Sequence, residues 1–378
     1  MNKPITIIGS GFAAYQLVKT LRRMDSNVAI TVITADKGHD YNKPDLSHVF
    51  SKKQSVADVI TIHADDFKQQ FNVELFAEHH VTNIDTNKQI ITANNQSFEY
   101  QKLVFATGAT PFVPPITGMH DGLALTLNSL NDFEQNQQHI QNAKSVLVIG
   151  GGLIGVEVAL DLANAGKKVT LVEPNSQLMQ IQLPEYVAQK LTQALELKTI
   201  KVYTATGVST IAQTDYGVVA TLTSGEQIEI EQILVCAGLK PNINLAQRAN
   251  LEVNRGICVN EFMQTSNANI YALGDCAEFE GQVKAYLQPT LISAAALGKT
   301  LLGEATKVTL LNMMVKVKTP NYPIQIGGKT DSSSVSRWNL DVQSQGIVAK
   351  GYDSADNMVG FVVTRDCTQQ AFSLLRQL

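Results

Sequence analysis

Residues 146–155 read VLVIGGGLIG, an apolar run of four residues that leads into three successive glycines. The run is short and mostly β-branched, which is typical of a strand buried on both faces of a parallel sheet. The helical pattern Val156–Ala165 follows at once, and Gly166 ends it. A second strand, Val169–Val172, leads into Glu173. Strand, helix and strand predict one βαβ unit.

The same pattern occurs 141 residues earlier, where residues 5–14 read ITIIGSGFAA. The helical pattern Tyr15–Arg23 follows this first turn, and the strand Ala29–Ala35 then leads into Asp36. Two βαβ units with glycine turns predict an α/β chain with two Rossmann-like, parallel-sheet nucleotide domains.

The glycine turns suit a dinucleotide pyrophosphate, because a helix N-terminus offers free N–H groups and a partial positive charge. The first glycine makes the tight turn, the second lets the backbone approach the phosphates, and the third position must be small. Gly9, Gly11 and Ala14 satisfy this pattern, as do Gly150, Gly152 and Gly155.

An acid that can bind an adenosine ribose stands 25 residues after Gly11 (Asp36) and 21 residues after Gly152 (Glu173). A single motif of this kind is equally well a plain glycine-rich turn. Two complete copies, each with strand, helix and acid, favour two dinucleotides. The simplest pair is FAD and a nicotinamide cofactor, with hydride passing between them.

The composition is that of a folded protein: 378 residues, 44% apolar and 17% charged, enough for two or three domains. The net charge of −4 argues against a nucleic-acid partner. Four scattered cysteines without a CxxC pair exclude a disulfide scaffold and a zinc ribbon, and no metal site is expected.

The chain enters a strand-like run within four residues of Met1, which leaves no room for a signal peptide. No window holds 18 consecutive apolar residues, so we expect no membrane-spanning helix. Together with the scattered cysteines, these features suggest the cytoplasm.

The tail changes character at about residue 309, where alternating runs predict antiparallel strands and a short helix near Ala371–Leu375. Residues 310–378 carry a net charge of +2, whereas the rest of the chain carries −6. We expect an FAD domain over 1–112 and 241–308, an NADH domain over 113–240, and a small α+β C-terminal interface domain over 309–378.

Two further motifs, Ala106-Thr107-Gly108 and Leu273-Gly274-Asp275, join the two glycine turns in a recognisable set. Over residues 1–308 this set resembles the two-dinucleotide-domain flavoprotein oxidoreductases. The resemblance implies that the N-terminal motif binds FAD and the central motif binds NAD(P)H. It also implies that Asp275 lies at the ribityl and phosphate region of FAD.

A finer resemblance is carried by Tyr41–His48, Ile270–Glu278, Leu287–Pro289 and Val317–Pro320. These segments are similar to rubredoxin reductases, and most of all to the branch that serves flavorubredoxin in bacterial nitric-oxide detoxification. This implies an oxidoreductase, cofactors FAD and NADH, and single electrons passed to the rubredoxin centre of a flavorubredoxin. The partner is expected to be an acidic iron protein.

The resemblance has two departures in the segment Tyr41–Phe50. This segment has no cysteine where related enzymes carry redox thiols, so electrons must leave the flavin directly. His48 stands where many ferredoxin reductases have a lysine, and we expect Lys43 to take that place.

Three residues are implied as catalytic. Glu157 matches a glutamate near the nicotinamide, and we expect Lys43 to pair with it; the plainer interpretation is a first-turn helix carboxylate. Lys318 matches a lysine at the flavin ring, where a cation stabilises reduced flavin; the plainer interpretation is a surface lysine.

We expect NADH rather than NADPH, because Glu173 would repel a 2′-phosphate and residues 174–177 contain no arginine. The expected NADH contacts are Gly150, Gly152, Leu153, Ile154, Gly155, Glu157, Glu173 and Gly238. The expected FAD contacts are Gly9, Ser10, Gly11, Phe12, Ala13, Ala14, Ala35, Asp36, Lys43, Pro44, Val81, Ala106, Thr107, Gly108, Gly274, Asp275, Leu287 and Lys318.

Other functions are also compatible with the sequence. The acceptor can be a plain rubredoxin, a [2Fe–2S] ferredoxin or oxygen, and a non-catalytic flavoprotein that senses NADH has the same nucleotide motifs. Local basic residues would steer an acidic partner. The candidates are Lys316, Lys329, Arg337, Lys350 and Arg365.

Overall fold

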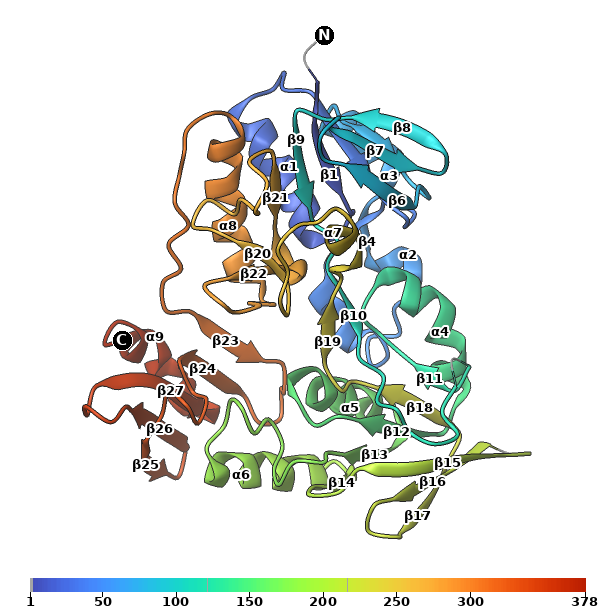
Figure 1. Ribbon diagram of the computed structural model, residues 1–378. Coiled ribbons are helices and arrows are strands. Elements are labelled where there is room, and N and C mark those ends of the chain that lie inside the picture. The colour runs from blue at the N-terminus through green and yellow to red at the C-terminus, as the bar shows by residue number, and fades with distance from the viewer. Residues whose placement is uncertain (1–2, 121, 216) are drawn as a thin grey trace. The chain divides into compact units, whose positions relative to one another are not determined.

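A computed structural model describes residues 3–120, 122–215 and 217–378 (Figure 1). The chain divides into two compact units. The first unit combines the residues up to Pro44 with Val56–Thr110 and Leu239–Leu310. The second unit combines Asp45–Ser55, Pro111–Gly238 and Leu311–Leu378. Among the described residues, no helix has the length and apolar character needed to cross a bilayer.

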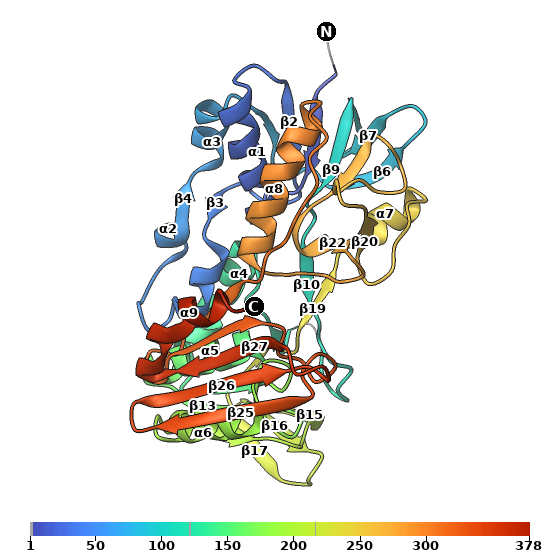
Figure 2. The ribbon, with the colours of Figure 1, turned by 90° about the vertical axis from the view of Figure 1, so that its left-hand side faces the viewer.

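The first unit is built on a parallel sheet with the strand order β21-β9-β1-β2-β5. Strands β1 and β2 are buried along their whole length, as expected for a sheet that is covered on both faces. Helices α1 and α8 lie side by side (Figures 1 and 2). The bounds are β1 Ile5–Ile8, α1 Phe12–Met24, β2 Ile30–Ile33, α3 Ala64–Gln70, β5 Glu74–Phe76, β9 Lys102–Phe105, β21 Ile270–Ala272 and α8 Leu287–Leu301.

Smaller elements complete the first unit. Strands β6, β7 and β8 form an antiparallel meander, β3 pairs with β4, and β20 pairs with β22. Their bounds, with those of the remaining helices, are β3 Asp40–Tyr41, α2 Val56–Val59, β4 Ile60–Ile62, β6 Val81–Asp85, β7 Ile90–Ala93, β8 Gln96–Glu99, α7 Asn244–Arg248, β20 Ile257–Val259, the 3-10 turn η2 Gly274–Cys276 and β22 Ala277–Phe279. Strands β10 (Ala109–Pro111) and β19 (Leu239–Pro241) pair where the chain leaves and re-enters this unit.

The second unit contains the other parallel sheet, with the order β11-β18-β12-β13-β14. An antiparallel sheet, β15-β16-β17, follows β14 along the chain. The bounds are β11 Ala124–Leu125, α4 Leu130–Asn142, β12 Ser145–Ile149, α5 Leu153–Asn164, β13 Lys168–Val172, α6 Glu185–Glu196, β14 Lys201–Tyr203, β15 Val208–Thr214, β16 Gly217–Leu222, β17 Gln227–Ile230 and β18 Gln232–Val235. The 3-10 turn η1, Lys43–His48, begins with the last two residues of a first-unit segment and ends in the second unit.

The C-terminal part of the second unit is the antiparallel sheet β23-β24-β27-β26-β25, drawn in orange to red in Figure 2. Residues of β26, β27 and the C-terminal helices bury a separate apolar core that includes Phe361, Val363 and Leu374. The bounds are β23 Met314–Val317, β24 Ile324–Gly328, β25 Arg337–Gln343, β26 Gly346–Tyr352, β27 Met358–Thr364, the 3-10 turn η3 Arg365–Gln370 and α9 Ala371–Leu375.

The predicted fold class is confirmed: two parallel Rossmann-like sheets and an antiparallel C-terminal part with a short helix. Both nucleotide helices begin three residues earlier than their apolar periodicity suggested, at Phe12 and Leu153. Each begins directly after the second glycine of its turn, because that glycine is the N-cap. The domain boundaries stay a prediction, and residues 45–55 cluster with the second unit.

The C-terminal core offers a direct test of burial. Phe361→Ala removes a side chain that is 0% exposed and leaves a cavity, so we expect the free energy of unfolding to fall by about 3–5 kcal/mol. Phe372→Ala removes the same group from a site that is 64% exposed and should change it by less than about 0.5 kcal/mol. Denaturant unfolding followed by fluorescence measures both. Equal effects of the two variants would contradict this packing of the C-terminal core.

Candidate functional site

The first glycine turn lies between β1 and α1. Gly9 has φ +113°, and a Cβ built on it would lie 2.3 Å from the carbonyl oxygen of Ala106, at the end of β9. Only glycine allows the turn to pass this close to the neighbouring strand. Gly11, the N-cap of α1, has open space around the position of a Cβ and no side chain capping the helix.

The second turn repeats this geometry between β12 and α5. Gly150 has φ +110°, and its Cβ would lie 2.5 Å from the carbonyl oxygen of Cys236. A Cβ on Gly155 would lie 1.8 Å from the carbonyl oxygen of Gly150, which is the close helix–strand packing expected of the third glycine. Gly152 again faces open space beside an uncapped helix N-terminus. Both turns therefore fit a pyrophosphate group.

The two acids that follow the turns differ in their surroundings. Glu173 is 6% exposed and accepts hydrogen bonds from the backbone N–H of Gly151 (2.6 Å) and from the backbone and side-chain nitrogens of Asn175 (2.8 and 2.6 Å). Its carboxylate is therefore held directly beside the second glycine turn. Asp36 is an exposed residue just beyond β2, and its backbone carbonyl accepts a hydrogen bond from Glu78.

Further residues expected at FAD meet around the start of α1. A Cβ on Gly274 would lie 2.6 Å from the Cβ of Ala13, so the turn that carries Asp275 packs directly against this helix. The Lys43 ammonium lies 3.5 Å from an Asp275 carboxylate oxygen, and both side chains are partly exposed. The structure thus brings the Gly-Asp motif, the N-terminal turn and Lys43 together within the first unit.

The other residues expected at FAD and NADH have varied placements. Ser10 is buried, with its hydroxyl 2.9 Å from that of Thr34. Val81 is buried at the start of β6, and Leu287 is exposed at the start of α8. On the nicotinamide side, Ile154 is 47% exposed at the start of α5, and Gly238 follows β18 with φ +112°. Their contacts with the cofactors stay predictions.

Glu157 is held by groups from two distant segments. It is 3% exposed, and its carboxylate accepts hydrogen bonds from the Ser47 hydroxyl (2.9 Å) and from the backbone N–H of Lys318 (2.8 Å). Two predicted catalytic residues, Glu157 and Lys318, are thus adjacent. The ion pair that Lys43 forms in its own unit is with Asp275, and the expected pair of Lys43 with Glu157 stays a prediction.

His48 lies half-buried beside this group. Burial lowers the pKa of its imidazole, and the positive charge of Lys318 lowers it further, against the opposite influence of Glu157 and Asp161. The lowered pKa favours the neutral form of the His48 imidazole.

Asp161 is a residue that the sequence motifs do not single out. It follows Glu157 by one helical turn on α5, is 1% exposed, and binds the Phe50–Ser51 segment. The i, i+4 spacing places it on the same helix face as Glu157, and this spacing is the one signal in the sequence that points to it.

The four cysteines do not form disulfide bonds with one another. All four are free. Burial raises the pKa of the Cys236 thiol to about 12, and burial also raises the pKa of Cys276. Neither is a thiolate at neutral pH. The described residues also contain no group of His, Cys, Asp and Glu arranged to hold a metal.

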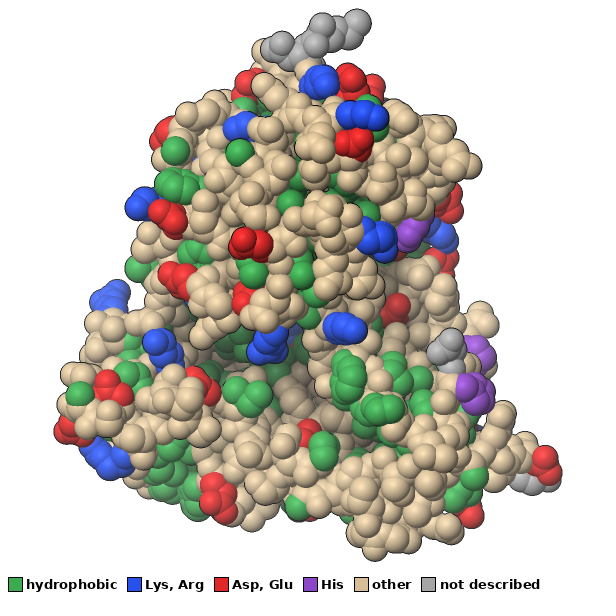
Figure 3. Space-filling view, in the orientation of Figure 1, with side chains coloured by type: hydrophobic (Ala, Val, Ile, Leu, Met, Phe, Trp, Pro, Cys, Tyr) green, Lys and Arg blue, Asp and Glu red, His purple; other side chains and the backbone are tan. Residues whose placement is uncertain are grey.

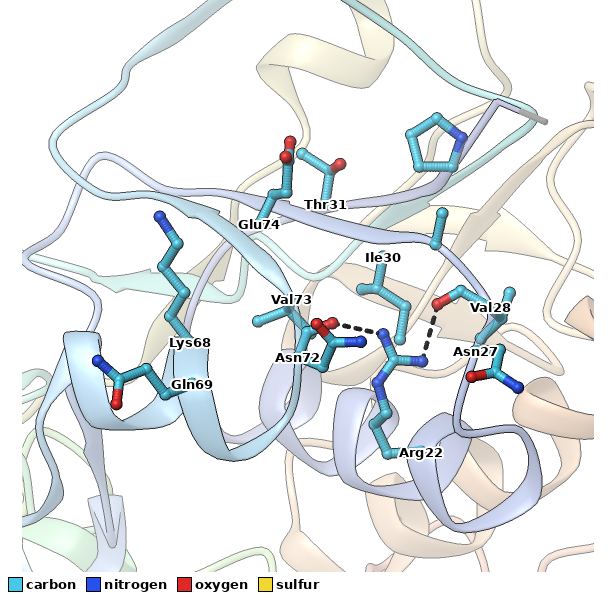
Figure 4. Close-up of a pocket in the computed structure, with 12 residues that line it drawn as sticks. Arg22, Asn27, Val28, Ile30, Thr31, Lys68, Gln69, Asn72, Val73 and Glu74 are labelled. Atoms are coloured by element: carbon cyan, nitrogen blue, oxygen red, sulfur yellow. Dashed lines mark hydrogen bonds between the residues drawn. The ribbon is translucent and has the colours of Figure 1, made fainter. Parts of the chain in front are cut away.

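A pocket lies at the amino ends of strands of the first sheet (Figure 4). Ile30 and Glu74, the first residues of β2 and β5, line it, so it lies away from the carboxyl strand ends where nucleotides bind. The Arg22 guanidinium beside it donates hydrogen bonds to the carbonyls of Val28 and Asn72 (2.8 and 2.7 Å). We interpret Arg22 as a structural residue that joins the segments containing Val28 and Asn72 by hydrogen bonds.

Two glycine turns at the carboxyl ends of two parallel sheets are the geometry of a protein that binds two dinucleotides. The profile of the pyridine nucleotide-disulphide oxidoreductase family matches residues 3–297, and that of the rubredoxin binding C-terminal domain matches residues 307–378. The chain belongs to the pyridine nucleotide-disulphide oxidoreductase family. Membership of this family implies binding of FAD and NAD(H).

Relatives match this chain along its entire length. The nitric oxide reductase FlRd-NAD(+) reductase of Aliivibrio fischeri is 52% identical, covering 100% of this chain and 99% of the relative. The Escherichia coli protein of the same name is 43% identical, with both chains covered in full. A solved ferredoxin reductase from Rhodopseudomonas palustris is 23% identical, with a TM-score of 0.89 over 99% of this chain and 94% of that one. This last likeness concerns the fold alone.

The space at Gly152 gives a test of the second turn. We expect Gly152→Ala to leave the fold intact, since a Cβ there meets no protein atom within 4 Å, and to weaken NADH binding at least tenfold because the methyl group occupies the space for phosphate. Gly207→Ala is the control, because its Cβ makes only ordinary contacts at 3.9 Å. Titration of the FAD-loaded protein with NADH measures the binding. Unchanged affinity in Gly152→Ala would place the pyrophosphate elsewhere.

Proposed function

We propose that this chain is an NADH-dependent reductase of flavorubredoxin and thereby supports nitric oxide reduction. The observation that carries this proposal is the 43–52% identity, over the full chain, to relatives named for this activity. The match of the tail to a rubredoxin binding domain supports the same acceptor.

Bound FAD supplies the chemistry that links the two half-reactions, since it accepts a hydride and releases single electrons. The chain binds and orients the two nucleotides. The N-termini of α1 and α5 present free N–H groups beside Gly11 and Gly152, which face open space. We propose that Asp275 contacts the ribityl and phosphate groups of FAD and that Lys43, which forms an ion pair with it, lies near the flavin.

Glu173 sets the choice of NADH in this proposal. Its carboxylate is fixed beside the second glycine turn by the bonds from Gly151 and Asn175. An adenosine ribose can donate hydroxyl hydrogen bonds to such a carboxylate, whereas a 2′-phosphate would meet a like charge.

Electrons leave by way of a protein partner, because the chain has no redox thiol pair to relay them. Lys318 is proposed to lie at the flavin ring, where its positive charge stabilises the reduced state. The Lys318 backbone N–H donates a hydrogen bond to Glu157, which fixes the position from which the lysine side chain extends.

Local charge accounts for the approach of an acidic partner. On the face shown in Figure 3, acidic and basic side chains are interspersed, so no broad field of one sign covers it. In the C-terminal part, Lys316, Lys329, Arg337 and Arg365 are exposed, and Arg337 is paired with Asp356. We propose that Lys316, Lys329 and Arg365 contribute most to steering. The cytoplasm is the proposed compartment, since the cysteines are thiols.

Anaerobic stopped-flow mixing tests this function. We expect NADH to bleach the flavin of the purified holoenzyme rapidly, and added flavorubredoxin, or its isolated rubredoxin domain, then to reoxidise the flavin as the iron absorbance falls. A [2Fe–2S] ferredoxin and oxygen serve as alternative acceptors. Fast bleaching with an unreactive rubredoxin centre would assign another acceptor, and a flavin that NADH does not bleach would overturn the proposal.

Glu173→Gln tests the nucleotide preference. The amide keeps an oxygen for the Gly151 N–H, loses one acceptor for Asn175 and removes the negative charge, so we expect kcat/KM for NADPH relative to NADH to rise at least tenfold, or about 1.4 kcal/mol. Glu196→Gln, an exposed residue on α6, is the control. Steady-state rates with both nucleotides measure the ratio. An unchanged ratio would show that Glu173 does not set the nucleotide preference.

A further inference from the structure

Helix α5 carries a second buried carboxylate, Asp161, one turn after Glu157. The two side chains are 1% and 3% exposed and lie on the same helix face. The helix itself begins at Gly152, where the pyrophosphate of NADH is proposed to bind. A segment that is hydrogen-bonded to these two acids is therefore fixed relative to the helix at which NADH is proposed to bind.

Asp161 holds the segment that follows the expected flavin loop. One oxygen accepts a hydrogen bond from the backbone N–H of Phe50 (2.9 Å), and the other accepts from the Ser51 N–H (3.2 Å) and the Ser51 hydroxyl. Three residues earlier, the Ser47 hydroxyl donates to Glu157 (2.9 Å). Both ends of residues 47–51 are thus bound to one face of α5.

The same segment is also held by apolar packing, which does not need an acid. Phe50 is 5% exposed, and its ring meets that of Phe133 on α4 edge to face, with the centroids 6.1 Å apart. Val49 and Leu46 are buried as well. These apolar contacts hold the segment against the second unit. The hydrogen bonds to Asp161 fix which of its residues lie opposite α5.

The carboxylate is matched to the donors that face it. Burial raises the pKa of Asp161, and the hydrogen bonds from Ser51 and Phe50 oppose that rise. An apolar side chain at this position would leave the Phe50 and Ser51 donors without their acceptor. The acid therefore holds the backbone geometry of residues 50 and 51.

The held segments lead to residues expected at the flavin. Asp45 is bonded covalently to Pro44, next to Lys43, and the Lys318 backbone is bound by Glu157 on the same helix face. We propose that Asp161 is a positioning residue for hydride transfer, which holds residues 47–51 in register with the NADH-binding helix. The inference rests on the proposed function, since it assumes that NADH binds at α5 and reduces the flavin.

Asp161→Asn in the FAD-loaded protein tests this role. The amide replaces an acceptor by a donor, so it cannot accept all the bonds from Phe50 and Ser51. We expect the flavin reduction rate at saturating NADH to fall at least tenfold, with the half-saturating NADH concentration changed less than twofold. Ser51→Ala keeps both backbone bonds and should give a smaller loss, and Glu196→Gln is the surface control.

A second readout is independent of turnover. Hydrogen exchange should become faster over residues 47–51 in Asp161→Asn, while β12 and β13 keep their wild-type protection. Wild-type rates with unchanged exchange would overturn the proposal, as would a loss confined to NADH affinity. If Asp161→Asn does not fold, the graded effect of Ser51→Ala decides. A wild-type flavin that NADH does not reduce would refute the proposed function instead, and the exchange result would still report whether Asp161 holds the segment.

Discussion

The architecture depends on one steric constraint, which occurs twice. A glycine turn passes so close to the end of the neighbouring strand in its sheet, β9 or β18, that no side chain fits. At Gly9 the obstacle is the carbonyl oxygen of Ala106, and at Gly150 it is that of Cys236, 2.3 and 2.5 Å from where a Cβ would be. This approach lets each helix start at the carboxyl end of its sheet, with its free N–H groups beside the open space at Gly11 and Gly152. The nucleotide sites follow from that placement.

A second constraint acts through buried charge. Helix α5 directs Glu157 and Asp161 toward segments that are far away in the sequence, 47–51 and 318. Buried carboxylates require such donors, because an unpaired buried charge is very costly. The two acids thus bind helix α5 to two segments that the resemblance places near the flavin. One is residues 47–51, which follow Lys43 along the chain, and the other contains Lys318.

The chain belongs to a family named for disulphide chemistry, yet its four cysteines are free thiols. High pKa values keep Cys236 and Cys276 protonated, so they are poor nucleophiles. In place of a thiol relay, the chain carries a C-terminal part that matches a rubredoxin binding domain. The electron exit is therefore a question of docking to a protein rather than of cysteine chemistry.

Local patterns were enough for much of this protein. Strand β1 and helix α9 have the bounds that the sequence predicts, since each depends on a short apolar run, and the glycine spacing itself predicts the two turns. The sequence also shows directly that the segment Tyr41–Phe50 contains no redox cysteine. It did not reveal that residues 45–55 cluster with the second unit, or that Glu157 binds Ser47 and the Lys318 backbone. Those contacts join residues more than 100 positions apart, and periodicity reports only neighbours, so only tertiary packing decided them.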